Sequence, residues 1–202
     1  MNVRLQYTMP FTAAVYWQNQ VIMNNYLVQV YMITNSYDPA SQNVAFDRMK
    51  HFIYNELAST VFINRDLEKE CKLLSAAGVD ITTLPAEPVD QLIGIMLYCK
   101  LNAIMEGYMV INEIEVSSEI GANMTYLHAA DESLGPFDSK GWWQDPDPIH
   151  CDLDVISTGK VLSIHRTGAW RELDLAWPNI DTDGDENNNT VVFTDFKQDE
   201  TK

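Results

Sequence analysis

The chain has 202 residues, of which 46% are hydrophobic, 10% are aromatic and 21% are charged. This composition excludes a disordered chain, because large apolar side chains are numerous enough to offset the conformational entropy lost on folding. Twenty-nine acidic residues against 13 lysines and arginines give a formal net charge of -16, and the basic residues are scattered singly. Direct binding of nucleic acid requires clustered Lys and Arg, so the charge argues against it. It favours either a solvated surface or docking on a basic surface of another protein.

Neither membrane insertion nor secretion is indicated by the sequence. The chain contains no run of about 18 apolar residues, so we expect no membrane-spanning helix. Polar residues and a proline interrupt residues 4–14, where a cleavable signal would need an apolar segment. We therefore expect a cytoplasmic protein, in the host cytoplasm or the virion if it is viral. Cys71, Cys99 and Cys151 lie far apart, so neither a disulfide framework nor a cysteine-rich zinc site is predicted.

The first elements along the chain are predicted to be strands. Residues 13–17 and 21–23 flank the polar tip 18–20, which is the pattern of a β-hairpin. Residues 26–33 are apolar on both faces and rich in residues that favour strands, as in the centre of a sheet.

Three helices are predicted next. Asp38 followed by Pro39 predicts a helix start, with the aspartate as N-cap, and apolar residues then recur at near-helical spacing. The polar residues of this helix that are expected to face water are Asp47, Arg48, Lys50 and Glu56. A second helix is predicted over residues 66–77, and the glycine after it is expected to be a left-handed cap. The third, over residues 89–106, is apolar on nearly all sides and belongs in a core.

Beyond residue 108 the pattern alternates with a period of two. Residues 108–116 and 124–128 predict a second hairpin with one face in water. A long loop is expected over 129–151, and residues 161–165 with 170–177 suggest one more strand pair.

The order of strands, helices and strands predicts a single α+β domain over residues 1–178. In this domain an antiparallel sheet, built from N-terminal and C-terminal hairpins, is packed on a central group of three helices. Residues 179–202 are predicted to be an acidic, flexible tail.

The densest group of chemically active side chains lies in a proline-containing loop. Carboxylates, an imidazole and a thiol occur within ten positions, and such oxygen and nitrogen ligands suit a divalent cation such as manganese, iron or zinc. The candidate ligands are Asp145, Asp147, His150, Asp152 and Asp154. The alternative is an ordered loop whose acids face water, and no two-histidine spacing supports the metal.

The adjacent Trp142 and Trp143 allow two interpretations. Tryptophan is favoured at interface hot spots, so the pair could bind a partner. The alternative is that both rings pack as a lid over a small core.

A second candidate metal site lies in the acidic tail. Counted from Asn179, oxygen-bearing side chains stand at loop positions one, three and five, and Gly184 stands at six, which is the first half of an EF-hand calcium loop. The candidate ligands are Asp181, Asp183 and Asp185. Position twelve is Thr190 instead of glutamate, so a hydrated acidic linker is the alternative. Because no catalytic motif is complete, we assign no catalytic residue and predict no cofactor other than such a divalent cation.

Several stretches resemble a family of uncharacterised proteins of T4-like tailed bacteriophages, especially those that infect marine bacteria. These stretches are residues 43–50, 60–64, 81–85, 89–96 and 141–150. The resemblance covers most of residues 10–177 and implies a viral origin. It implies no activity and no site residues.

Three functional hypotheses follow from the sequence. The first is a non-enzymatic, phage-encoded interaction or regulatory protein that docks on a basic protein surface. The second is a metal-dependent enzyme that uses the Asp145–Asp154 loop. The third is a structural component of the virion.

Overall fold

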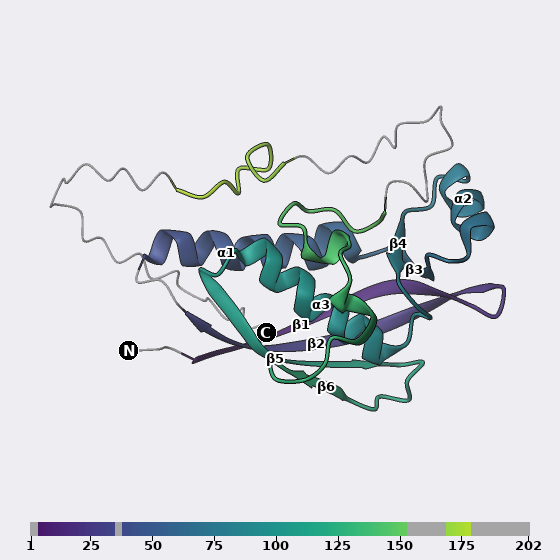
Figure 1. Ribbon diagram of the computed structural model, residues 1–202, viewed down its shortest axis with the longest axis horizontal. Coiled ribbons are helices and arrows are strands. Elements are labelled where there is room, and N and C mark those ends of the chain that lie inside the picture. The colour runs from purple at the N-terminus through teal and green to yellow at the C-terminus, as the bar shows by residue number, and fades with distance from the viewer. Residues whose placement is uncertain (1–3, 35–37, 153–168, 179–202) are drawn as a thin grey trace, which may run out of the picture.

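The computed structural model describes residues 4–34, 38–152 and 169–178, and these residues form a mixed α+β fold. Six strands form one sheet in the order β4-β3-β1-β2-β5-β6. The strands are β1 (Arg4–Trp17), β2 (Gln20–Thr34), β3 (Val61–Asn64), β4 (Ile81–Leu84), β5 (Met109–Ser118) and β6 (Tyr126–Ala129). The helices are α1 (Pro39–His51), α2 (Glu68–Ala76) and α3 (Asp90–Met105), with a π-helix (Phe52–Leu57) continuing α1 and short 3-10 turns at Gly135–Asp138 and Trp142–Gln144. Helices α1 and α3 cover one face of the sheet (Figure 1). Within the described residues, none of these helices has the length and apolar character needed to cross a bilayer.

The N-terminal hairpin is much longer than the sequence pattern indicates. Strands β1 and β2 pair antiparallel along their whole lengths, from Arg4 opposite Ile33 to Trp17 opposite Gln20. The two turn residues between them both have positive φ, which is the conformation of a type I′ turn. Pro10 is tolerated inside β1 because the other neighbour, β3, pairs only with residues 14 and 15 of that strand.

The sheet is mixed, so the expectation of a purely antiparallel sheet is wrong for one half of it. Strand β3 pairs parallel with β1, and β4 pairs parallel with β3. Helix α2 connects β3 to β4, and a crossover of this kind returns the chain in the same direction. Strands β5 and β6 pair antiparallel with their neighbours. Residues 161–165 lie outside the described residues, and 170–177 form turns and irregular structure where a strand was expected.

Local signals place the helix ends as predicted. Asp38 caps α1, since its carboxylate accepts hydrogen bonds from the backbone N–H groups of Ala40 at 3.1 Å and Ser41 at 3.0 Å. After α2, Gly78 adopts a φ of 77°, as a left-handed cap requires. Helix α3 ends at Glu106, which is itself left-handed with a φ of 47°.

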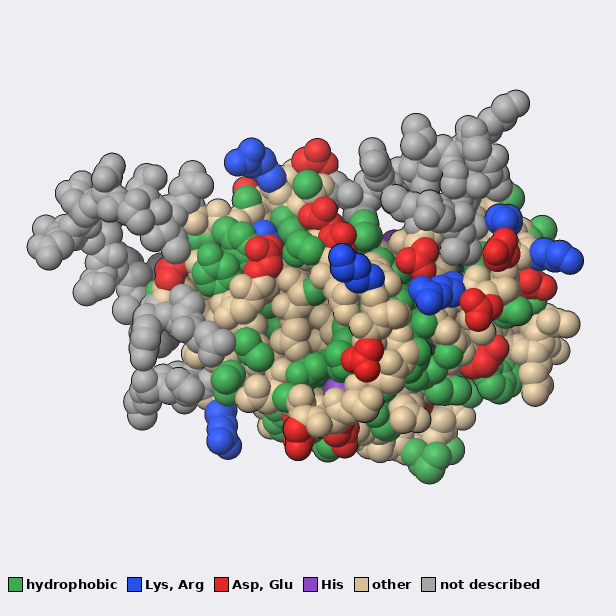
Figure 2. Space-filling model, in the orientation of Figure 1, with side chains coloured by type: hydrophobic (Ala, Val, Ile, Leu, Met, Phe, Trp, Pro, Cys, Tyr) green, Lys and Arg blue, Asp and Glu red, His purple; other side chains and the backbone are tan. Residues whose placement is uncertain are grey.

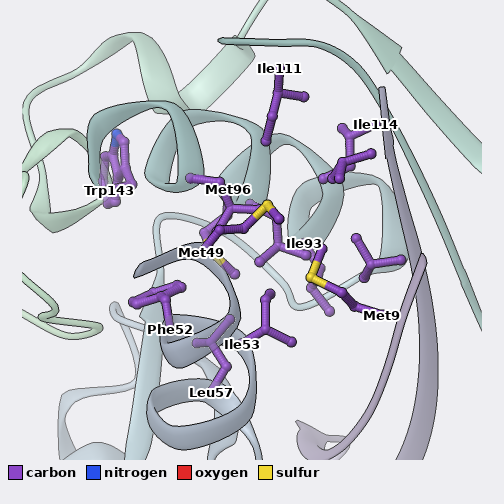
Figure 3. Close-up of a cluster of buried hydrophobic side chains, with 14 of the residues drawn as sticks. Met9, Met49, Phe52, Ile53, Leu57, Ile93, Met96, Ile111, Ile114 and Trp143 are labelled. Carbon is purple, nitrogen blue, oxygen red and sulfur yellow. The ribbon is translucent and has the colours of Figure 1, made fainter. Parts of the chain in front are cut away.

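The core lies between the sheet and the layer of α1, the π-helix and α3 (Figure 3). Among its fully buried side chains are Met9, Met49, Phe52, Ile53, Ile93, Met96, Ile111, Ile114 and Trp143. A second, smaller cluster lies on the opposite face of the sheet, where Cys71 of α2 packs on Ala14, Val61, Ile63 and Ile81. Since neighbouring strand residues point to opposite faces, β1 and β3 are buried on both sides at this point.

Arg48 holds residues 169–178 against the helices. Its Nε donates to the backbone oxygen of Leu175 at 2.8 Å, and its guanidinium carbon lies 3.8 Å from the ring centroid of Trp177 and 5.0 Å from that of Trp170. A second nitrogen pairs with Glu106 at 2.8 Å. Arg48 is therefore buried, and the expectation that it faces water is wrong, because residues far along the chain cover it.

Candidate functional site

The centre of the predicted metal loop is filled by a lysine from helix α3. The Nζ of Lys100 donates hydrogen bonds to the backbone oxygens of Trp142 at 3.0 Å, Asp145 at 2.7 Å and Asp147 at 2.6 Å. The side chain is fully buried, and burial lowers the pKa of Lys100 to about 7, while the nearby carboxylates of Asp145, Asp147 and Glu56 act in the opposite direction. The loop is thus organised around an internal cation that sequence reasoning overlooked. The available signal was a lysine in the largely apolar part of the predicted core helix.

The proposed ligands of this loop point to different partners. The carboxylate of Asp145 accepts from the backbone N–H of Asp147 at 2.8 Å. Asp152 lies 3.7 Å from a guanidinium nitrogen of Arg65, and its backbone N–H donates to the hydroxyl of Thr83 at 3.0 Å. Asp154 lies outside the described residues, as do Asp181, Asp183 and Asp185. Within the described part of the chain, no three His, Cys, Asp or Glu side chains are arranged to hold a metal ion.

Trp142 and Trp143 are core residues in this structure. Their side chains are 3% and 0% exposed, and both indole N–H groups donate to backbone oxygens, Trp142 to Thr83 at 2.8 Å and Trp143 to Phe137 at 3.0 Å. A Cβ atom at Gly141 would lie 2.3 Å from the ring of Trp143, so only glycine fits there. These positions agree with the packing interpretation, because neither of the two indoles is exposed.

A buried carboxylate lies beside the same loop. Glu56 of the π-helix has one oxygen 3.0 Å from Nε2 of His51 and the other 3.9 Å from Nδ1 of His150. Burial raises the pKa of Glu56 to about 7; the charge of Asp80 raises it further, and that of Lys100 lowers it. The sequence pattern placed Glu56 in water. That expectation is wrong, because the loop carrying His150 lies against this turn of the helix. Single π-helical turns are frequent at functional sites.

The three thiols are poor nucleophiles. Burial raises the pKa of Cys71 to about 11, and that of Cys99 and Cys151 to about 12. Thiolate is the reactive form, so none of the three is activated at neutral pH.

The structure adds a surface feature that the sequence did not indicate, an apolar groove of about 590 Å³. It lies between the β1–β2 hairpin, the connection from β5 to β6 and the first turn of α3. The groove is lined by Val15, Trp17, Ile22, Asn24, Pro88, Val89, Asp90, Gln91, Ile120, Gly121, Met124, Thr125 and Tyr126. The lining is mostly apolar, and Asp90 is its only ionisable carboxylate.

Large apolar side chains stand exposed in and around this groove. Met124 is 74% exposed, and Trp17, Val89 and Ile120, which also line the groove, are exposed as well. Hydrophobic side chains reach the surface at the end of the molecule where the hairpin projects (Figure 2). Contiguous exposed apolar surface of this kind marks interaction sites in soluble proteins.

Polar contacts fix the walls of the groove. Asn24 of β2 accepts a hydrogen bond from the backbone N–H of Ile120 at 3.1 Å, which ties the connection between β5 and β6 to the hairpin. Both oxygens of Asp90 lie within 2.9 Å of the hydroxyl of Ser118. Burial raises the pKa of Asp90 above its ordinary value, and the contact with Ser118 lowers it.

Comparisons with known proteins identify no function. No family model matches the chain, and no curated protein matches it. Among solved structures, the chain is similar to an uncharacterized protein from Wolinella succinogenes, with 13% sequence identity and a TM-score of 0.47. The similarity covers 65% of this chain and 99% of the other. At this level the likeness indicates neither an activity nor a family for the protein described here.

Proposed function

We propose that the protein is a non-enzymatic interaction protein that binds another protein through the apolar groove. The observation that supports this most is the groove itself, about 590 Å³ in volume and lined by exposed side chains such as Ile120 and Met124. Burying these side chains in a complex would remove apolar surface from water at about 25 cal/mol per Å². Methionine side chains also adapt to the shape of a partner.

The charge of the chain supports a partner with a basic surface. The formal net charge is -16, so a basic protein would be attracted from a distance, and the attraction would fall as salt screens it. The sequence resemblance adds the proposal that the protein is phage-encoded and acts in the host cytoplasm or the virion.

The two alternatives have less support. A metal-dependent enzyme using the Asp145–Asp154 loop would need its carboxylates to converge, whereas in the described part of the loop the backbone oxygens of Asp145 and Asp147 converge on Lys100. No contact within the described residues specifically supports the third hypothesis, a structural component of the virion.

Paired variants of the full chain test the proposal. Wild-type protein and the variants Met124→Glu and Leu73→Glu are immobilised and exposed to host-cell extract, and bound proteins are identified by mass spectrometry. Leu73 is a matched control, because it is 70% exposed on α2, away from the groove. We expect a specific partner to bind wild type and Leu73→Glu but not Met124→Glu, and to be released as salt rises. A partner that binds all three equally would refute the groove as the binding surface.

A further inference from the structure

The carboxylate of Asp90 lies half-buried in the groove without a cationic neighbour. Among the ion pairs formed between described residues none includes Asp90, and no Lys, Arg or His lines the groove. Its two oxygens share the hydroxyl of Ser118, at 2.9 Å and 2.8 Å, and that hydroxyl carries a single proton. An ionised carboxylate accepts about four hydrogen bonds, so Asp90 is left with unused capacity.

The backbone approaches this carboxylate closely on one side. A Cβ atom at Gly121 would lie 2.2 Å from an oxygen of Asp90, so only a glycine leaves room there. The N–H of Gly121 donates to the hydroxyl oxygen of Ser118 at 3.0 Å, which holds the hydroxyl in place. The side of the carboxylate that stays open is the side that faces the groove, among apolar neighbours.

A charge in such surroundings is best stabilised by an opposite charge. A carboxylate removed from water loses hydration, and a desolvated Lys or Arg recovers much of that loss through a short, charge-assisted hydrogen bond. Because the Asp90 carboxylate is half-buried, such a pair is screened less than one on a fully exposed surface. The net charge of -16 favours the approach of a cationic segment.

The extent of the apolar surface indicates the size of the occupant. The exposed apolar side chains that line the groove come from three segments: Trp17 from the hairpin, Val89 from the start of α3, and Ile120 and Met124 from the connection between β5 and β6. An occupant that contacts all three segments at once, as a peptide segment would, removes the most apolar surface from water.

We propose that the groove binds a peptide segment of a partner protein that combines apolar side chains with one Lys or Arg, and that this cation pairs with Asp90. The inference rests on the proposed function, because it names the chemistry of the partner at the same groove. In the bound state the apolar side chains contact Trp17, Ile120 and Met124. The cation reaches the open side of the Asp90 carboxylate.

A library of random 12-residue peptides is the probe that tests this. The library is selected on immobilised full-length wild type, Met124→Glu and Asp90→Asn. We expect the peptides enriched on wild type to be apolar with one Lys or Arg. We expect the cation to be lost from the peptides selected on Asp90→Asn, and no enrichment on Met124→Glu.

A double-mutant cycle then measures the affinity of one selected peptide, with changes made to Asp90 in the protein and to the cation in the peptide. Replacing Asp90 by Asn, or the cation of the peptide by methionine, is expected to weaken binding more than about tenfold, and the two changes together no further than either alone. Leu73→Glu serves as the control and should bind as wild type does. Because Asp90→Asn could disturb the start of α3, Gln91→Lys is a second variant. Its exposed side chain lines the groove, and the added cation should compete with that of the peptide.

The outcomes separate the two proposals. Peptides that are enriched equally on wild type and Met124→Glu would overturn the groove as a binding surface, and with it the pairing. Peptides that require Met124 but carry no Lys or Arg, or that bind Asp90→Asn and Gln91→Lys as well as wild type, would overturn the pairing alone. If no peptide is enriched and wild type sediments as a dimer that Met124→Glu dissociates, the occupant is a second copy of the chain, and the partner proposal is wrong.

Discussion

The side-chain nitrogen of Lys100 lies 2.6 Å from the backbone oxygen of Asp147, at the centre of the loop that carries Asp145 and Asp147. The loop binds this cation through main-chain oxygens and leaves its carboxylates directed elsewhere. Lys100 thus connects helix α3 to the turn that contains Trp142 and to the two aspartates that follow it. The loop acquires a fixed shape from an internal charge.

Removing the hydrogen-bond donor that Lys100 provides should destabilise the fold. In Lys100→Met the side chain keeps its length, but buried backbone oxygens lose their donor, and we expect the free energy of unfolding to fall by about 2 to 3 kcal/mol. Denaturant unfolding measures the change. Lys50→Met is the control, because Lys50 is partly exposed and its ammonium contacts only neighbours on the same helix, Asp47 and the ring of Phe46. Its effect should stay within about 0.5 kcal/mol. Equal stability of both variants would contradict the structural role of Lys100.

Glu56 should make stability depend on pH in a defined direction. Its pKa is raised from 4.5 to about 7, so between these values the folded protein holds a proton that the unfolded chain releases. The stabilisation is fully present below pH 4.5 and is lost as pH rises to 7. Groups facing Glu56 are His51, His150, Asp80 and Lys100.

The variant Glu56→Gln isolates this contribution. It stays neutral at every pH, so it should match wild type near pH 4.5 and exceed it by about 3 to 3.5 kcal/mol at pH 8, because one pKa unit corresponds to about 1.4 kcal/mol. Denaturant unfolding across this pH range gives the difference. Glu68→Gln, at an exposed position of α2, should show no such change. A pH-independent difference for Glu56→Gln would show that the carboxylate titrates normally.

Arg48 should not be replaceable by lysine. Lysine retains the charge but loses the planar guanidinium that stacks on Trp177 and donates to Leu175. We expect Arg48→Lys to lower the free energy of unfolding by about 2 kcal/mol and to speed amide hydrogen exchange in residues 169–178. Arg4→Lys, at the exposed start of β1, is the matched control and should change neither measurement.

Metal addition tests the two acidic candidate sites. We expect manganese, zinc and calcium to leave the melting temperature of wild type unchanged, because in the described loop the converging oxygens already bind Lys100. A rise with manganese or zinc that disappears in the double variant Asp147→Asn, His150→Ala would support the loop as a metal site. A rise specific to calcium that disappears in Asp183→Asn would instead support the site predicted in the tail.

The features that could be predicted from the sequence are those whose physical cause lies within a few neighbouring residues. Asp38 before Pro39 started a helix because the carboxylate reaches N–H groups two and three positions on. Gly78 ended a helix because it adopts positive φ without strain. The largely apolar run from 89 to 106 produced a core helix because most of its side chains are buried, although the pattern did not explain Lys100.

The burial of particular polar groups and the order of the strands could not be predicted, because both depend on contacts between distant parts of the chain. Arg48 and Glu56 have the spacing of a solvated helix face, but residues about a hundred positions away cover both. Leu175 and Trp177 contact Arg48, and His150 lies beside Glu56. The four-residue strands β3 and β4 are too short for a periodic signal, and their parallel pairing depends on the crossover through α2. The groove likewise forms only where the hairpin, the connection between β5 and β6 and α3 meet. Burial is a property of the folded chain as a whole, because the segments that exclude water from a side chain are distant from it in the sequence.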